Sequence, residues 1–129
     1  MINLASFITM YLGVANTGDN PENKGQCVGL VEQWLDANKK PHIYGNACDL
    51  LNNANLAAFH IVRNTPTNVP PVGAIVVWGS SWGGGYGHCA VVVAANVHYL
   101  AVFEQNNPES SPPVVATHDY SGVLGWVYW

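Results

Sequence analysis

The sequence has few charged residues, and basic residues are the scarcest. Four Lys plus Arg stand against eight Asp plus Glu, which gives a net charge of −4, and only 9% of all residues are charged. A nucleic-acid-binding surface needs several cations to neutralise phosphates, so no nucleic-acid partner is expected. The same shortage removes any general attraction to an anionic cell surface, so affinity for such a target must come from a binding groove or another module.

The N-terminal stretch MINLASFITMYLGVANTGDN has neither a basic start nor a long hydrophobic run. Asn3, Ser6 and Thr9 interrupt its apolar residues well before the ~20 that cross a bilayer. We therefore expect no membrane partner, no signal peptide and synthesis in a cytoplasm, where thiols stay reduced. Three cysteines, an odd number, also disfavour a disulfide framework.

The remaining composition is typical of one globular domain. The chain has 129 residues, of which 49% are hydrophobic, and it contains 13 glycines and 8 prolines. This length suffices for one core, so residues 1–129 are expected to form a single domain. Helical periodicity in the first half and β-branched runs in the second half predict an α+β fold, with N-terminal helices packed on a C-terminal antiparallel sheet.

The expected elements can be placed along the chain. Helices are predicted over residues 4–12, 27–38 and 46–58, where apolar residues recur at helical spacing. Strands are predicted within VPPVGAIVVWG, HCAVVVAA and VHYLAVFEQN, followed by one or two strands around VVATHDY and GVLGWVYW. The glycine-rich segment SSWGGGYG forms the loop between the first two strands.

Cys27 stands at the predicted start of the second helix. Unpaired N–H groups and the helix dipole stabilise a thiolate there, although a free cysteine is more often a small buried hydrophobe. An activated cysteine needs a base and a group that orients the base. His88 opens one predicted strand, and Glu104 and Asn106 close the next, so antiparallel pairing would bring both within reach of the imidazole. Their spacing of two places them on one face of a strand.

The segments GQCVGLVEQW, PPVGAIVVWGSSWGGGYGHCAVVV, FEQN and GVLGWVYW resemble, in order and spacing, the CHAP family. This family comprises cysteine, histidine-dependent amidohydrolases and peptidases common in phage endolysins. The resemblance runs from about Phe7 to Trp129. It implies a papain-like fold and a hydrolase of bacterial peptidoglycan, either an N-acetylmuramoyl-L-alanine amidase or a stem or cross-bridge endopeptidase. It also implies synthesis in a host cytoplasm, action on the cell wall, and a separate wall-binding domain or subunit.

The resemblance also implies roles for individual residues. It makes Cys27 the nucleophile, His88 the base, Glu104 the acid that orients the base, and Asn106 a further polar residue of the site. Gln26 matches the family's usual Gln before the nucleophile and is expected near the oxyanion and the substrate.

Two aromatic residues of the glycine-rich loop are further candidates for substrate binding. Trp82 and Tyr86 precede the predicted base and could line a groove, where they would stack on a sugar or peptide stem. A loop tryptophan can equally fold back onto the core, so both interpretations stay open.

Metal binding is not favoured. Several relatives bind calcium through acids in the loop before the nucleophile and through an acid two residues after it. Here Asp19, Asn20 and Glu22 are the only weak calcium candidates, because Lys24 adds a positive charge and position 29 is glycine. The sequence has no C-x-x-C or H-x-x-x-H pair, the spacings that would support a zinc site. The other two cysteines, Cys48 and Cys89, are expected to be core thiols. We therefore expect no cofactor.

Two other functions compete with wall hydrolysis. One is a catalytically inactive wall-binding module of the same fold, and the other is a papain-like hydrolase of a different amide. The presence of all four predicted site residues, Cys27, His88, Glu104 and Asn106, disfavours the inactive module.

Overall fold

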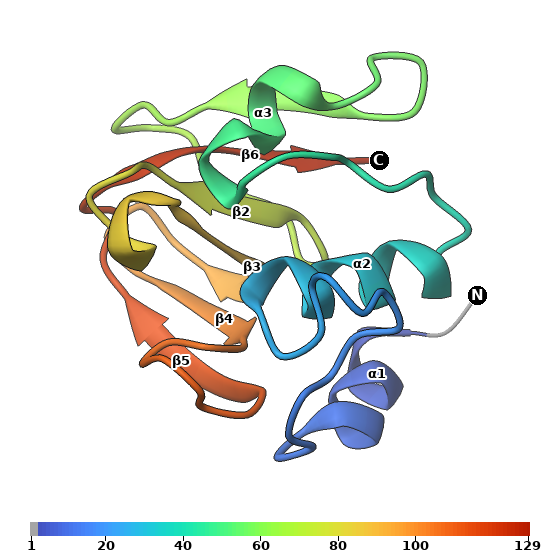
Figure 1. Cartoon of the computed structure of the whole chain (residues 1–129). Coiled ribbons are helices and arrows are strands. Elements are labelled where there is room, and N and C mark those ends of the chain that lie inside the picture. The colour runs from blue at the N-terminus through green and yellow to red at the C-terminus, as the bar shows by residue number, and fades with distance from the viewer. Residues whose placement is uncertain (1–2) are drawn as a thin grey trace.

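The computed structural model describes residues 3–129, and Met1 and Ile2 of the expected domain lie outside the described residues (Figure 1). Its helices are α1 (Leu4–Tyr11), α2 (Cys27–Ala37) and α3 (Leu50–Asn53), with 3₁₀ turns at Ala47–Asp49 and Gly83–Gly85. Its strands are β1 (His60–Arg63), β2 (Ile75–Trp78), β3 (His88–Ala95), β4 (Leu100–Glu104), β5 (Val114–His118) and β6 (Val123–Tyr128). None of the helices within residues 3–129 has the length and apolar character needed to cross a membrane.

The six strands form one antiparallel sheet in the order β1-β6-β2-β3-β4-β5. Helix α2 packs against β3, and α3 lies beside β6 (Figure 1). The predicted α+β fold, with N-terminal helices on a C-terminal antiparallel sheet, is therefore confirmed. Both late segments that were predicted as one or two strands form strands, β5 and β6.

Helix α2 is bounded by local backbone geometry at both ends. Gln26 has extended dihedral angles, φ −91° and ψ 164°, so the helix begins at Cys27. At the other end the Asn38 side chain donates to the Trp34 carbonyl at 2.8 Å, and Lys39 follows with a left-handed φ of 56°. The thiol of Cys27 therefore lies at the helix N-terminus, as predicted.

The region between α2 and β2 differs from the prediction. The helix expected over residues 46–58 ends at Asn53, so the prediction was wrong beyond that residue. Asn55 ends the helical region because its side chain accepts a hydrogen bond from the Ala57 N–H at 2.9 Å, a local turn that competes with helix. As a result Leu56, an apolar residue within the expected helix, is 77% exposed. Strand β1, which pairs with β6 at the sheet edge, was not predicted.

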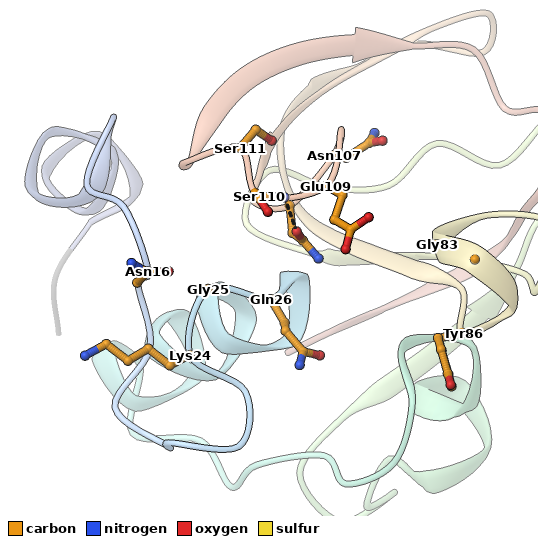
Figure 2. A pocket seen from close by; sticks show the side chains of 12 residues that line it. Asn16, Lys24, Gly25, Gln26, Gly83, Tyr86, Asn107, Glu109, Ser110 and Ser111 are labelled. Atoms are coloured by element: carbon orange, nitrogen blue, oxygen red, sulfur yellow. Dashed lines mark hydrogen bonds between the residues drawn. The ribbon is translucent and has the colours of Figure 1, made fainter.

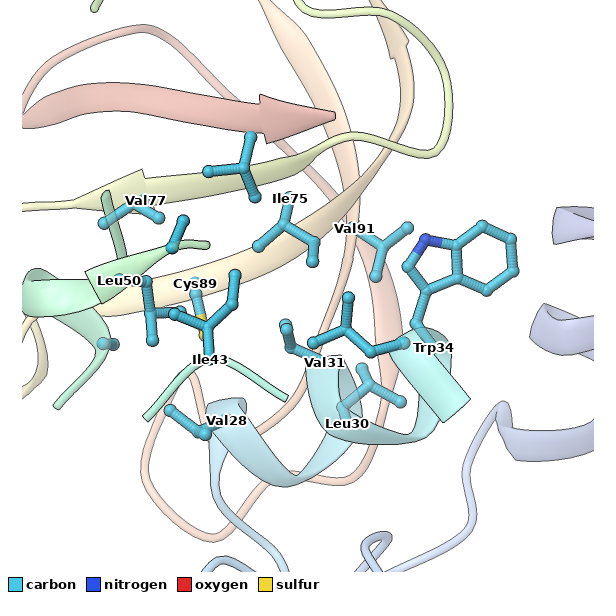
Figure 3. Close-up of a cluster of buried hydrophobic side chains, with 14 of the residues drawn as sticks. Val28, Leu30, Val31, Trp34, Ile43, Leu50, Ile75, Val77, Cys89 and Val91 are labelled. Atoms are coloured by element: carbon cyan, nitrogen blue, oxygen red, sulfur yellow. The ribbon is translucent and has the colours of Figure 1, made fainter. Parts of the chain in front are cut away.

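Apolar side chains are buried on both faces of the sheet. Figure 3 shows the cluster between α2 and the sheet, which includes Val28, Val31, Trp34, Ile43, Leu50, Ile75, Val77, Cys89 and Val91. The opposite face buries a second cluster, which includes Val76, Trp78, Ala90, Val92, Leu100, Val102 and Trp126. Successive residues of β2 and β3 therefore contribute to opposite clusters, as the two-residue period of a strand requires.

The sheet curls around the second cluster. His118 on β5 and Trp78 on β2 have ring centroids 5.5 Å apart, although β3 and β4 lie between their strands. In a flat sheet, three spacings of ~4.8 Å would separate the two backbones by ~14 Å. Curvature removes much of this distance and gives the sheet a concave face. The candidate site lies at the end of the sheet where β3 begins and the antiparallel β4 ends, beside the N-terminus of α2.

Candidate active site

Cys27, the first residue of α2, contacts the side chains of two successive residues of β3. The pKa of Cys27 is lowered to about 4, first by a hydrogen bond with Cys89 and then by the hydrogen bond and positive charge of His88, which together outweigh burial. The unpaired N–H groups of the first helical turn act in the same direction. Cys27 is therefore a thiolate at neutral pH.

Cys89 was predicted to be a core thiol, and it is fully buried. Burial and the neighbouring Cys27 raise the pKa of Cys89 well above its ordinary value, so Cys89 keeps its proton and can donate it toward the Cys27 sulfur. The sequence prediction missed this contact with the nucleophile. The two-residue period of a strand turns Cys89 to the face opposite His88, and this is the face that α2 and Cys27 cover.

His88 is buried at the start of β3, and its Nε2 lies 2.9 Å from Oε1 of Glu104. Because Glu104 occupies Nε2, the nitrogen left for Cys27 is Nδ1. Burial alone would lower the pKa of His88, but its hydrogen bonds with Cys27 and Glu104 and their negative charges raise it to about 9. The structure thus places the three residues that were predicted as nucleophile, base and orienting acid, Cys27, His88 and Glu104, next to one another.

Glu104 ends β4, and its carboxylate is almost inaccessible to solvent. Burial would raise the pKa of Glu104, but hydrogen bonds and charge from His88 and His118 lower it overall. His118 was given no role by the sequence. Its Nε2 lies 3.0 Å from Oε1 and 3.1 Å from Oε2 of Glu104, and Asn107 adds a longer contact of 3.3 Å to Oε1.

Asn106 is not on the same strand face as Glu104, so that part of the prediction was wrong. Strand β4 ends at Glu104, and Asn106 has a left-handed φ of 66°. Its side-chain oxygen accepts a hydrogen bond from the Ser110 N–H at 2.6 Å. The left-handed turn directs the side chain away from the strand register that the prediction assumed. Asn106 nevertheless lines the same cavity as Cys27 and His88.

Gln105, between Glu104 and Asn106, is a structural residue that the sequence prediction missed. It is fully buried, and its amide donates to the carbonyls of Thr17 at 2.9 Å and Gln26 at 2.7 Å. Its side-chain oxygen accepts from the Thr17 N–H at 2.9 Å. These bonds join the end of β4 to the residue before Cys27, so they fix the helix start relative to Glu104.

Two neighbouring cavities open at this site. The cavity of about 420 Å³ is lined by Cys27, His88, Gln26, Tyr86 and Asn106, among others. A larger cavity of about 690 Å³ shares Gln26, Tyr86 and Asn106 with it and extends toward Glu109 and Lys24. Figure 2 shows Gln26, Tyr86 and Glu109 around the larger cavity, on three different segments of the chain.

The two aromatic candidates behave differently. Tyr86 is 65% exposed and lines both cavities, where it is accessible to a ligand. Trp82 lines neither of these two cavities. Its ring stacks on Trp78 at 5.1 Å and lies parallel to the His88 ring, with centroids 5.9 Å apart and an interplanar angle of 16°. This is the folded-back alternative that the sequence left open.

A family model for the CHAP domain matches residues 16–106. The chain belongs to the CHAP domain family. This confirms the resemblance on which the residue roles were predicted, since the matched range contains Cys27, His88, Glu104 and Asn106.

The proteins similar to this CHAP domain include two endolysins. Endolysin PlyTW of Staphylococcus phage Twort is 28% identical over 113 residues, which cover 79% of this chain and 24% of that protein. The wild-type endolysin LysIME-EF1 superposes with a TM-score of 0.74 at 24% identity, over 99% of this chain and 64% of that one. PlyC has a TM-score of 0.72 at 23% identity, over 98% of this chain and 35% of that one. The chain therefore spans about a quarter of PlyTW and less than two thirds of either solved structure.

The loop before Cys27 does not fit the calcium site of some CHAP domains. Asn20 uses its side-chain oxygen to accept a hydrogen bond from the Glu22 N–H at 3.1 Å. The Asn23 carbonyl packs so closely on Gly29 that a Cβ there would lie 2.2 Å from it, which leaves no room for an acidic side chain. Within residues 3–129 no group of three or more His, Cys, Asp or Glu side chains could hold a metal ion. Calcium takes about six to eight oxygen ligands, and Asp19 and Glu22 are the carboxylates among the three candidates of this loop.

Proposed function

We propose that this CHAP domain is a cysteine-dependent hydrolase that cleaves an amide bond of bacterial peptidoglycan, as phage endolysins do. The observation that carries the proposal is the ionised Cys27 beside His88, with Glu104 on the far side of the imidazole, in a cavity open to a ligand. Nucleophile, base and orienting acid in this arrangement are what thiol-dependent acyl transfer requires.

The proposed reaction begins with attack of the Cys27 thiolate on the carbonyl carbon of the scissile amide. The negative oxygen of the tetrahedral intermediate is stabilised by N–H groups of the first helical turn, with the Gln26 side chain beside them. The intermediate collapses, the C–N bond breaks, and His88 gives its proton to the leaving amine. Water then attacks the thioester while His88 takes up a proton from it, and this releases the carboxylic acid and restores the Cys27 thiolate. Glu104 keeps the imidazole oriented throughout.

Two scissile bonds are compatible with this chemistry. One joins the lactyl group of muramic acid to L-alanine, and the other is a peptide bond of the stem or cross-bridge. Both are amides that the thiolate would attack in the same way, so groove shape selects between them. Tyr86 and Asn106 line both cavities and are the proposed substrate contacts.

We also propose that a separate wall-binding domain or subunit provides most of the affinity for the cell wall. The chain has a net charge of −4 and only four basic residues, so its own surface does not attract an anionic wall. The catalytic groove would then need to bind only the few groups around the scissile bond. An inactive wall-binding module remains the rival, but it gives no reason for a thiolate within an ion-paired site.

The test is clearing of purified Gram-positive cell walls by the wild-type domain, by Cys27→Ala and by Cys48→Ala. Cys48 is the matched control because it is also a partly buried free cysteine but lines neither cavity. We expect clearing by the wild type and by Cys48→Ala, none by Cys27→Ala, and released fragments whose masses identify the bond. Equal clearing by all three proteins would remove Cys27 from the mechanism, and no clearing of walls from a broad panel would favour a different amide.

A further inference from the structure

The buried carboxylate of Glu104 is held by two histidines, and the reaction proposed above uses only one of them. His88 contacts Oε1 at 2.9 Å, whereas His118 contacts Oε1 at 3.0 Å and Oε2 at 3.1 Å. We propose that His118 is a positioning residue for thiol hydrolysis, which holds the Glu104 carboxylate so that its Oε1 faces His88. The inference rests on the proposed function, because it assigns a role within that reaction.

The distribution of donors around Glu104 supports this role. Oε1 accepts hydrogen bonds from His88 and His118 and a longer one, of 3.3 Å, from Asn107. Among the described residues, His118 is the one side chain that is hydrogen-bonded to Oε2. A contact that bridges both oxygens fixes the plane of a carboxylate, which a single donor does not. Without His118, rotation about the last bond of the Glu104 side chain would be restrained mainly by His88 itself. The acid could then no longer orient the base independently.

His118 is itself fixed by aromatic packing. Its ring makes edge contacts with Trp78, at a centroid distance of 5.5 Å, and with Trp82, at 5.3 Å. Trp82 also lies parallel to His88. The rings of His88, His118, Trp78 and Trp82 thus pack against one another on the concave face of the sheet. A phenylalanine at position 118 would keep this packing but lose the N–H donor, so packing and hydrogen bonding can be separated by mutation.

The charged groups around His118 come from three segments. Glu104 on β4 faces its Nε2, His88 on β3 lies across the same carboxylate, and Asp119 follows it in the chain and accepts a hydrogen bond from the Ser121 N–H. The two indoles that pack on it are neutral. If the His118 N–H donor is lost, we therefore expect the Glu104 carboxylate to be held less firmly beside His88. Its negative charge would then stabilise the His88 imidazolium less.

The test compares His118→Phe with His118→Gln. For His118→Phe we expect kcat on soluble wall fragments to fall about tenfold, the size of one charge-assisted hydrogen bond, with KM within about twofold. His118→Gln keeps an N–H donor at similar reach and is expected to restore kcat to within about threefold of wild type. NMR titration should show the His88 pKa reduced by about one unit in His118→Phe but not in His118→Gln. His98→Phe, at an exposed position between β3 and β4, is the matched control.

Two results would overturn the inference. One is a His118→Phe variant with wild-type kcat and an unchanged His88 titration. The other is an equal loss of activity in both variants together with a reduced free energy of unfolding, which would show a purely structural role. If His118→Phe does not fold, His118→Asn replaces it, because its amide is too short to reach Glu104. The titration needs no wall substrate, so it decides the role of His118 even if the wild type clears no walls and the proposed function fails.

Discussion

Alkylation of Cys27 by iodoacetamide is expected to be almost independent of pH between about pH 5.5 and 7.5. The reacting species is the thiolate, so the rate follows the thiolate fraction. Hydrogen bonds with Cys89 and His88, and the charge of His88, lower the pKa of Cys27 to about 4 against the opposing effect of burial. Cys27 is therefore fully ionised over the whole interval.

The expected difference from an ordinary thiol is large. For a cysteine with a pKa of ~8.5, the thiolate fraction falls about tenfold for each unit by which the pH is lowered, or about 100-fold across the two units of the experiment. For Cys27 the thiolate fraction changes by less than ~5% over the same interval, since its pKa lies more than a full unit below the lower limit. The slope of rate against pH therefore distinguishes the two cases, and this holds for any Cys27 pKa below about 4.5.

The assay measures alkylation at each cysteine separately. Samples are quenched at set times, digested, and the peptides containing Cys27, Cys48 and Cys89 are quantified by mass spectrometry, with N-acetylcysteine as the reference thiol. The slope is compared and not the absolute rate, because a thiolate of low pKa is also a weaker nucleophile. Cys89 is fully buried and is expected to stay unmodified while the protein is folded.

A tenfold fall in Cys27 alkylation per pH unit would refute the reasoning. Cys27 would then be an ordinary thiol at neutral pH, and the ion pair with His88 would not exist in the resting protein. The Cys89→Ala variant separates the two causes, because its slope should stay flat if His88 alone is sufficient to hold the thiolate.

Three further predictions follow from named contacts. Glu104→Gln removes the charge beside His88, so the alkaline limit of wall clearing should move down from the His88 pKa of about 9, and an unchanged pH profile would contradict the ion pair. Gln105→Leu leaves the buried Thr17 N–H without its partner and removes one of the hydrogen bonds to each of the Thr17 and Gln26 carbonyls, so it should lower the free energy of unfolding by about 1–3 kcal/mol in urea. Gly29→Ala should destabilise by about 1–3 kcal/mol, because its Cβ would meet the Asn23 carbonyl, whereas stabilisation would mean that the loop moves freely.

The prediction from sequence was most accurate where the information is local. Helical spacing placed α2 and its first residue, Cys27, and β-branched runs placed β2 and β3. Hydrophobic periodicity and turn residues act over a few residues, so they can be seen without the fold. Strand β1 and the early end of α3 were missed for the same reason. Pairing with β6 creates β1, and the turn at Asn55 ends the helical region.

Antiparallel pairing of two predicted strands was sufficient to expect Glu104 within reach of His88, whereas the sequence supported the approach of Cys27 to His88 only through their order and expected element placement. The assignment of Asn106 to the same strand face failed because the left-handed turn after β4 ends the alternation of side chains. The alternation of side chains along a strand predicts the face of the sheet on which a residue lies only as long as the strand continues.

The rest of the site was decided by tertiary structure alone. In the strand register His118 lies opposite Leu100, four residues from Glu104, so pairing by itself gives no reason for their contact. Curvature of the sheet brings the two side chains together on its concave face and places the Trp82 ring against both histidines. The sequence by itself thus determined which groups could carry the chemistry, whereas the curl of the sheet determined what surrounds them, because curvature is a property of all the strands packed together and of no single segment.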